Sequence, residues 1–307
     1  MKTSFLALRM FAAPTIALTI AGCGGAASPI ASSPAMPGAL VSQRHHEAPH
    51  LQPNSANLLY VTSYGLQKVY VYHYPSLNPA GVLTEVAPFG LCINDANGDI
   101  YVVDRADGYN LVDGYHHGAT TPFTTLTLGS VDPISCAVDP TTGNLAVTTD
   151  NSVAIFLNAA GSPNFVSSTI GNMWGAGYDP NGNLFVDDSS FGGYAEISHT
   201  NPLGPMVPVT LQATIAHPGG VQWDGHHMTV GDQYAQIIYQ LKPNGHTFGT
   251  VSLPGSVEVP YYDVLGHKVV ATDRNLHKIY LYNYDTGTMI NSITLPADDV
   301  LGIGISQ

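Results

Sequence analysis

The sequence of 307 residues is poor in charged side chains, and positive charge is the scarcest. Only 10% of residues are charged, and nine Lys and Arg against 22 Asp and Glu give a formal net charge of −13. Such a chain repels phosphate backbones, so a nucleic-acid-binding function is not expected, whereas cations, basic peptides and neutral sugars stay open as ligands. The few charges disfavour exposed helical faces, and 32 Gly, 22 Pro and 17 Tyr favour short strands joined by tight turns.

Short catalytic motifs are also missing. The sequence contains no Gly-x-Ser-x-Gly, no His-Glu-x-x-His, no phosphate-binding loop and no Cys-x-x-Cys pair. The common serine hydrolases, zinc proteases, nucleotide-binding proteins and thiol oxidoreductases therefore have no sequence anchor in this chain. Enzymes that assemble a site from loops of different repeats carry no such motif, so this absence leaves an enzyme open.

The first 22 residues have the three regions of a secretory signal. Lys2 and Arg9 precede an apolar run over residues 10–21, and small residues then lead to Cys23. The run is too short for a transmembrane helix. Residues 20–23, Ile-Ala-Gly-Cys, resemble the lipobox of bacterial lipoproteins, which implies cleavage before Cys23 and acylation of its thiol. The alternative is an ordinary secretory signal that is cleaved nearby.

We therefore expect an exported protein that is anchored to the cell envelope by lipid, with the membrane as one partner. Residue 24 is Gly and not Asp, which by the same resemblance implies sorting to the outer membrane in a diderm organism. Residues 23–56 are rich in Pro, Ala, Ser and Gly without hydrophobic periodicity, so they are expected to form the lipidated, flexible tether. Without residues 1–22 the formal charge becomes −15, because seven basic residues then face 22 acidic ones.

From residue 57 onward the sequence is repetitive. Six strand-like segments recur at spacings of 41, 45, 39, 44 and 41 residues, measured at their second residues Leu59, Ile100, Leu145, Leu184, Met228 and Val269. This period is the length of a four-stranded propeller blade. An apolar segment that ends in Asp precedes five of the six, and turn sequences such as Asp-Pro-Asn-Gly follow three of them. Residues 57–307 are thus predicted to form an all-β, six-bladed β-propeller with four strands in each blade.

The C-terminal strand is predicted to close this ring. The first repeat lacks an inner strand, and residues 301–306 match the pattern around Cys92 in the second repeat. Closure would remove the open strand edge that otherwise invites aggregation. The inner strands are expected near residues 90–95, 134–138, 175–178, 220–223, 259–262 and 301–306.

These repeats resemble those of NHL-type six-bladed propellers, with residues 88–104 as the best copy. Residues 59–62 and 278–287 are similar to YVTN-type propeller repeats. The Asn-His-Arg-Ile segment common in NHL repeats is absent, and residues 275–279 come nearest to it. Such repeats record strand packing and turn chemistry, so the resemblance implies a fold and leaves the function open.

A ligand is expected where the loops that lead into the inner strands converge at one end of the central channel. These loops carry Asp132, Trp174, His217, Glu258 and Asp299. The three acids and His217 suit a divalent cation such as Ca²⁺ or Zn²⁺, and Trp174 would form a stacking wall. The alternative, which we favour, is that these residues cap loops and are solvated.

Two classes of function remain open. The first is a binding or scaffold module for a protein, peptide or sugar, held near the membrane by its tether. The second is an enzyme with its site at the channel mouth: a metal-dependent hydrolase or lactonase resembling gluconolactonase-type propellers, or a lyase with His217 as base. No catalytic residue is assigned.

Two cysteines of the repeat region, Cys92 and Cys136, align at equivalent places in neighbouring repeats. An exported protein allows a disulfide between them. Inner strands of adjacent blades diverge, however, so we expect two free, buried thiols.

Overall fold

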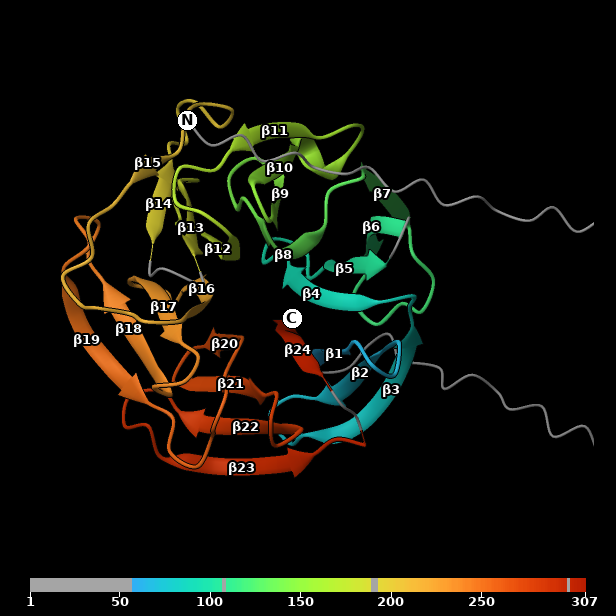
Figure 1. Ribbon diagram of the computed structural model, residues 1–307. Helices are drawn as coiled ribbons and strands as arrows, with labels where there is room; N and C mark the ends of the chain where they lie inside the picture. Colours follow the sequence, from blue (N-terminus) through green and yellow to red (C-terminus); the bar gives the residue numbers. More distant parts are fainter. Residues whose placement is uncertain (1–56, 107–108, 189–192, 297–298) are drawn as a thin grey trace, which may run out of the picture. The chain divides into compact units, whose positions relative to one another are not determined.

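A computed structural model describes residues 57–106, 109–188, 193–296 and 299–307, and the expected signal, Cys23 and the tether lie outside them. Six sheets of four antiparallel strands surround a central axis (Figure 1). The prediction of an all-β, six-bladed propeller is thereby confirmed. Within the described residues the only helix is the 3-10 helix η1 (Leu157–Ala159). None of the described segments forms a helix that is long and apolar enough to cross a membrane.

Each blade has an inner strand next to the axis and three further strands that follow it outward. From the inner strand to the outer strand, blade 1 consists of β24 (Val300–Ser306), β1 (Leu58–Ser63), β2 (Lys68–His73) and β3 (Asn78–Thr84). Blade 2 consists of β4 (Pro88–Ile93), β5 (Ile100–Ala106), β6 (Tyr109–Tyr115) and β7 (Thr124–Gly129). Blade 3 consists of β8 (Pro133–Val138), β9 (Leu145–Thr149), β10 (Ser152–Phe156) and β11 (Asn164–Ser167).

The other three blades follow the same order. Blade 4 consists of β12 (Met173–Tyr178), β13 (Leu184–Asp188), β14 (Tyr194–Ile197) and β15 (Val207–Pro208). Blade 5 consists of β16 (Pro218–Trp223), β17 (Met228–Asp232), β18 (Ile237–Leu241) and β19 (Thr247–Ser252). Blade 6 consists of β20 (Tyr262–Leu265), β21 (Lys268–Asp273), β22 (Lys278–Asn283) and β23 (Met289–Thr294).

The C-terminal strand β24 supplies the inner strand of blade 1, as predicted. Its register pairs Leu59 with Ile305 and Val61 with Ile303. The hydroxyl of Thr62 accepts a hydrogen bond from the amide of Gly302 (2.7 Å). The strand is buried along its whole length. The ring is therefore closed by residues from both ends of the repeat region.

The hydrophobic core lies between neighbouring blades. Between blades 4 and 5, for example, Phe185 and Tyr194 pack against Val221 and Val230, and all four side chains are buried. Aromatic and β-branched side chains that alternate along a strand fill the space between two stacked sheets efficiently. This packing leaves only the inner strands to face the axis.

The inner strand of blade 6 differs from the expected 259–262. Strand β20 begins at Tyr262, and its Val264 pairs with Val269, the residue of that blade at which the repeat spacing is measured. Asp263 looks in the sequence like the turn residue that ends the inner strands of other blades. It pairs instead with Val270 inside the ladder. Because side chains alternate along a strand, this shift of one position directs Asp263 to the channel.

A similar shift occurs at the turn that follows β4. The apolar segment before this turn ends in Asp95 in the sequence, but Asn94 caps the turn, since its side-chain oxygen accepts a hydrogen bond from the amide of Ala96 (3.1 Å). Gly98 has a φ of +76°, as the turn requires. Asp95 is exposed, and no hydrogen bond or ion pair joins it to another described residue.

The expectation of free thiols is wrong. Cys92 and Cys136 form a disulfide, with their Cα atoms 5.4 Å apart. The ladder shows that they are not equivalent: Cys92 pairs with Tyr101, whereas Cys136 corresponds to Leu91 and pairs with Val147. This offset of one residue lets the two side chains meet between β4 and β8, which lie close together near the axis.

The two ends of the channel are built differently. We call the end where the inner strands finish and turn into the second strands the turn face. The opposite end, where loops from the preceding blade lead into the inner strands, is the entry face. At the entry face, carboxylates at the ends of second strands hold these loops: Asp232 accepts the amide of Ala216 (3.1 Å), and Asp273 accepts that of Val257 (2.7 Å).

Candidate functional site

A cavity of about 450 Å³ occupies the central channel and is lined by the inner strands of all six blades. Turn residues such as Asp95, Asp179, Asp224 and Gly266 form its rim, so the cavity opens at the turn face. Tyr261 lies at its inner end. The volume is within the range of pockets that hold small organic ligands. The open end is therefore the opposite one from the entry-face mouth that the sequence suggested.

Three aromatic rings close the channel towards the entry face. The ring of Trp174 stacks on that of Tyr261 with 5.9 Å between centroids, and Phe89 meets Trp174 edge to face at 5.7 Å. Tyr261 reaches from blade 6 to the far side of the axis, where the Asp187 carboxyl contributes to raising its pKa, although burial is the larger cause. The three rings make the channel a blind pocket.

The neighbouring inner strands leave room for this tyrosine. Ladder positions equivalent to Tyr261 are occupied by small residues in the other blades, namely Gly90, Ser135, Gly175, Gly220 and Gly302. The glycines also let adjacent inner strands approach closely. A Cβ at Gly90 would lie 2.4 Å from the carbonyl oxygen of Ile134, and one at Gly175 would lie 2.6 Å from that of Gly219. The ring of Tyr261, surrounded by five small residues, thus fills the cross-section of the channel at this level.

Asp263 is the acid that faces the channel. Its Oδ1 accepts a hydrogen bond from the side-chain amide of Gln222 (2.9 Å), and its Oδ2 accepts the amide of Ile305 (2.5 Å). It is half-buried because it faces the cavity, yet protein atoms surround it, and this desolvation raises its pKa to about 7. The charge of Asp95 contributes to this rise. A cation in the cavity would reverse both effects.

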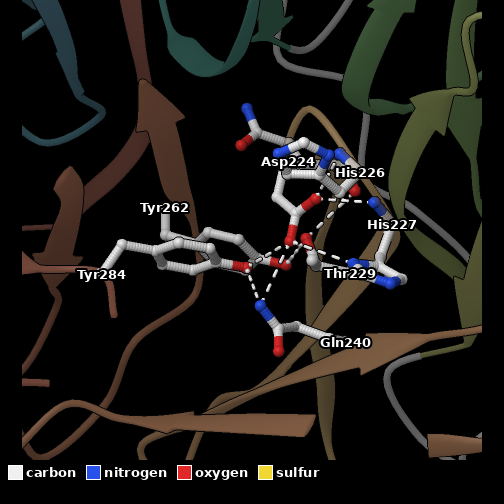
Figure 2. Close-up of polar contacts among 8 residues, drawn as sticks. Asp224, His226, His227, Thr229, Gln240, Tyr262 and Tyr284 are labelled. Carbon is white, nitrogen blue, oxygen red and sulfur yellow. Dashed lines mark hydrogen bonds and ion pairs between the residues drawn. The ribbon is translucent and has the colours of Figure 1, made fainter. Parts of the chain in front are cut away.

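Asp224, on the rim of the cavity, is the centre of a second polar cluster (Figure 2). Its carboxylate accepts hydrogen bonds from the hydroxyl of Tyr284 (2.8 Å) and the side-chain amide of Gln240 (3.3 Å). The backbone amides of His226 and His227 donate to its other oxygen at 2.8 and 2.6 Å. With four donors the carboxylate is saturated, so its role is to join blades 5 and 6 and to hold the rim in place.

A second cavity of about 440 Å³ adjoins this rim between blades 4 and 5. Asp179 and Trp223 line both cavities. On its outer side His227 stacks on Phe248, with ring centroids 4.2 Å apart, and Phe248 is 59% exposed. The turn face therefore offers a central pocket with an aromatic side pocket next to it.

The residues predicted from the sequence lie at the entry face, beyond the aromatic closure. Asp132 is exposed and forms an ion pair with Arg105 (3.4 Å), whose guanidinium group lies over the ring of Phe89. Trp174 belongs to the closure itself, and its indole nitrogen is buried with no hydrogen-bond partner among the described residues. Trp174 therefore packs between Phe89 and Tyr261 on the closed side of the channel, and its role as a stacking wall for a ligand stays a prediction.

Glu258 and Asp299 are brought together by Arg274. The guanidinium group donates to Asp299 (2.9 Å) and lies 3.8 Å from a carboxylate oxygen of buried Glu258. The exposed His217 meets the ring of Tyr234 edge to face. Among the described residues, the three acids and His217 do not form a group whose ligand atoms lie within 4.8 Å of one another. The cation ring at this face stays a prediction and gains no support from the geometry.

The comparisons with known proteins show the fold alone. No family model matches the chain, and no curated protein matches its sequence. The chain is similar to one in the crystal structure of a nidogen/laminin complex, with a TM-score of 0.71 and 14% identity, covering 82% of this chain and 99% of that chain. It is also similar to a protein of unknown function from Bacteroides caccae, with a TM-score of 0.63 and 12% identity, covering 82% of this chain and 100% of that chain.

Proposed function

We propose that the protein is an exported, membrane-tethered binding module that holds the positively charged group of a small organic ligand in the turn-face cavity. The observation that carries the proposal is the composition of the cavity wall. Four aspartates line it, Asp95, Asp179, Asp224 and Asp263, and no Lys, Arg or His is among the described lining residues. An acidic pocket with low-dielectric walls concentrates cations.

Two of these aspartates accept the fewest hydrogen bonds from the protein, and we expect these two to contact a ligand. Asp179 and Asp224 are occupied by hydrogen bonds within their own turns and blades. Asp95 is exposed on the rim, and Asp263 lies deeper between Gln222 and Ile305. In this proposal a primary or quaternary ammonium group lies between them, with one carboxylate at each depth facing it. Aromatic side chains along the wall would add cation–π attraction.

The enzyme alternatives gain no support from the described residues of the cavity. Its two cysteines are joined in the disulfide, and its one serine, Ser135, has no histidine among the lining residues to act as a base. Asp224 already accepts four hydrogen bonds. A hydrolase or lyase needs a nucleophile or base that is free to exchange a proton. Asp263, with a pKa raised to about 7, could exchange one, but no hydrogen bond joins it to Ser135, the one serine among the described lining residues.

Calorimetry with the full chain tests the binding proposal, using alkylammonium, tetramethylammonium and guanidinium salts beside neutral sugars. We expect an organic cation to bind wild type, and the double variant Asp95→Asn/Asp263→Asn to lose at least about tenfold in affinity. Asp299→Asn at the entry face is the matched control and should bind as wild type does. Binding of sugars alone, or equal binding by the double variant, would contradict the proposal.

The tether is the second part of the proposal. It is supported by the signal-like residues 1–22 and by the Cys92–Cys136 disulfide, since disulfides persist mainly in oxidising compartments outside the cytosol. Wild type should partition into detergent and carry acyl chains on Cys23, while Cys23→Ala should yield a soluble protein or uncleaved precursor. Mass spectrometry that finds an unmodified Cys23 at the mature N-terminus would refute lipidation.

A further inference from the structure

Blade 2 holds a group of three carboxylates that the channel does not use. Glu85 lies in the loop that leads into β4, Asp104 lies on β5, and Asp113 lies on β6. One oxygen from each lies within 4.8 Å of the others. Ligand atoms around a calcium ion, at 2.3–2.6 Å from the metal, are at most about 5 Å apart, so the spacing suits one ion.

Two of the equivalent acids in other blades use their carboxylates more fully than Asp104 does. The equivalent acids Asp232 and Asp273 use both carboxylate oxygens to accept backbone amides of the loops beside them. Asp104 uses only Oδ1, which accepts the amide of Ala87 (3.1 Å). Its Oδ2 is fully buried and has no amide or hydroxyl partner among the described residues. The carboxyl of Glu85 is within hydrogen-bonding reach of the Asp104 carboxyl, so the two buried acids must share either a proton or a cation.

The three carboxylates have hydroxyl partners and are largely shielded from solvent. The hydroxyl of Tyr115 donates to Glu85 (2.5 Å), and the hydroxyl of Thr125 donates to Asp113. Burial is the main cause that raises the pKa of Glu85 to about 8 and that of Asp104 to about 6, and no basic side chain counteracts it. Glu85 and Asp104 are buried, whereas Asp113 is half-buried and gives access from solvent.

We propose that Glu85, Asp104 and Asp113 form a divalent-cation site that prefers Ca²⁺. The ligands are all oxygens, with no His or Cys in the group, which favours a hard ion over Zn²⁺ or Cu²⁺. The ion would bind the buried Oδ2 of Asp104 and fix the loop before β4 to the second and third strands of blade 2. It lies outside the channel and does not depend on the proposed organic ligand.

The test is titration of the full chain, stripped with chelator, with CaCl₂, MgCl₂ and MnCl₂ by calorimetry and thermal unfolding. For wild type we expect saturable Ca²⁺ binding and a melting temperature that rises with the logarithm of free Ca²⁺. Glu85→Gln and Asp113→Asn should each weaken binding by more than about tenfold. Glu196→Gln, a half-buried acid on the third strand of blade 4, is the matched control and should retain it.

A second readout locates the ion. Terbium in place of calcium should emit when tyrosine is excited, because the hydroxyl of Tyr115 contacts the ligand Glu85. Tyr115→Phe should reduce this emission while calcium binding persists in calorimetry. If wild type shows neither heat nor thermal shift with any of the three ions, or if both carboxylate variants bind as wild type does, the group only shares protons and the proposal fails. Asp263→Asn should leave Ca²⁺ binding intact, which separates this site from the channel.

Discussion

The two ends of the channel carry similar numbers of acidic residues but differ in whether basic side chains pair with them. At the entry face, Arg105 and Arg274 pair with Asp132, Glu258 and Asp299. At the turn face, no basic side chain is among the described residues that line the cavity. The entry face is also sealed by stacked rings, whereas the turn face is open. Acidic residues alone therefore do not indicate a binding site. A binding site is indicated where the acids lack a basic partner and are accessible from solvent.

The largest loss of stability is expected from deleting strand β24, which runs from one end of the channel to the other. Strand β24 runs from Val300 at the entry face to Ser306 at the turn face, and deletion of residues 301–307 removes the inner strand of blade 1. We expect loss of cooperative unfolding in thermal denaturation. Deletion of Gln307 alone, which is exposed and lies beyond β24, is the control. A truncated chain that melts like wild type would show that the ring does not need closure.

The second prediction concerns Tyr261, one of the rings that close the channel towards the entry face. Tyr261→Ala removes the ring that fills the channel, and we expect a loss of about 3–5 kcal/mol in the free energy of unfolding, measured with urea. Tyr261→Phe keeps the ring and removes a buried hydroxyl whose one side-chain neighbour for a hydrogen bond, among the described residues, is Ser135, so its cost should be about 1 kcal/mol. Equal losses in both variants would mean that the hydroxyl, and not the ring, holds this end.

The third prediction concerns the unpaired charge at the open end. The pKa of Asp263 is raised to about 7 in the folded protein, so the folded state binds its proton more tightly than the unfolded state does. Stability from this group is fully present below about pH 4 and is lost as the pH rises through about 7, by up to about 4 kcal/mol. Buried Asp187, Glu85 and Asp104, whose pKa values are also raised, add losses of the same sign that Asp263→Asn leaves in place.

Urea denaturation from pH 4 to pH 8 measures this loss. Asp263→Asn should flatten the pH dependence and be more stable than wild type at pH 8, where wild type must keep the carboxylate ionised near Asp95 and Tyr74. Asp299→Asn, whose acid is paired with Arg274, should retain the wild-type slope. An unchanged slope in Asp263→Asn would show that this acid is not desolvated.

The smallest effect is expected from the paired acids. Arg274→Gln leaves Glu258 buried with only the distant hydroxyl of Tyr234 (3.4 Å). Because the Arg274 side chain is 41% exposed and solvent screens it, the expected cost is about 1 kcal/mol. The double variant Arg274→Gln/Glu258→Gln should recover most of it, as read from urea midpoints. A double variant that is no better than the single one would mean that Arg274 acts through packing.

The fold was accessible from the sequence because each blade repeats the same turn chemistry and strand pattern. The site was not, because it depends on single-residue register. Asn94 takes the capping role expected of Asp95, and Asp263 lies within a strand although its sequence resembles a turn. The disulfide was missed for the same reason, since Cys92 and Cys136 are offset by one position. A signal did exist for the closed end: Tyr261 is a large residue where the repeats otherwise place glycine or serine.

The pairing of β24 with β1 also determines when blade 1 can complete its folding. Thr62 and Gly302, which this pairing joins, are 240 residues apart, whereas each of the other five blades is contiguous in the sequence. Those blades can form in turn as the chain emerges, while β1 keeps an unpaired edge until the last residues arrive. A prematurely terminated chain would retain that edge and be prone to aggregate or to be degraded. The closing strand thus makes the completion of blade 1 depend on residues 300–306.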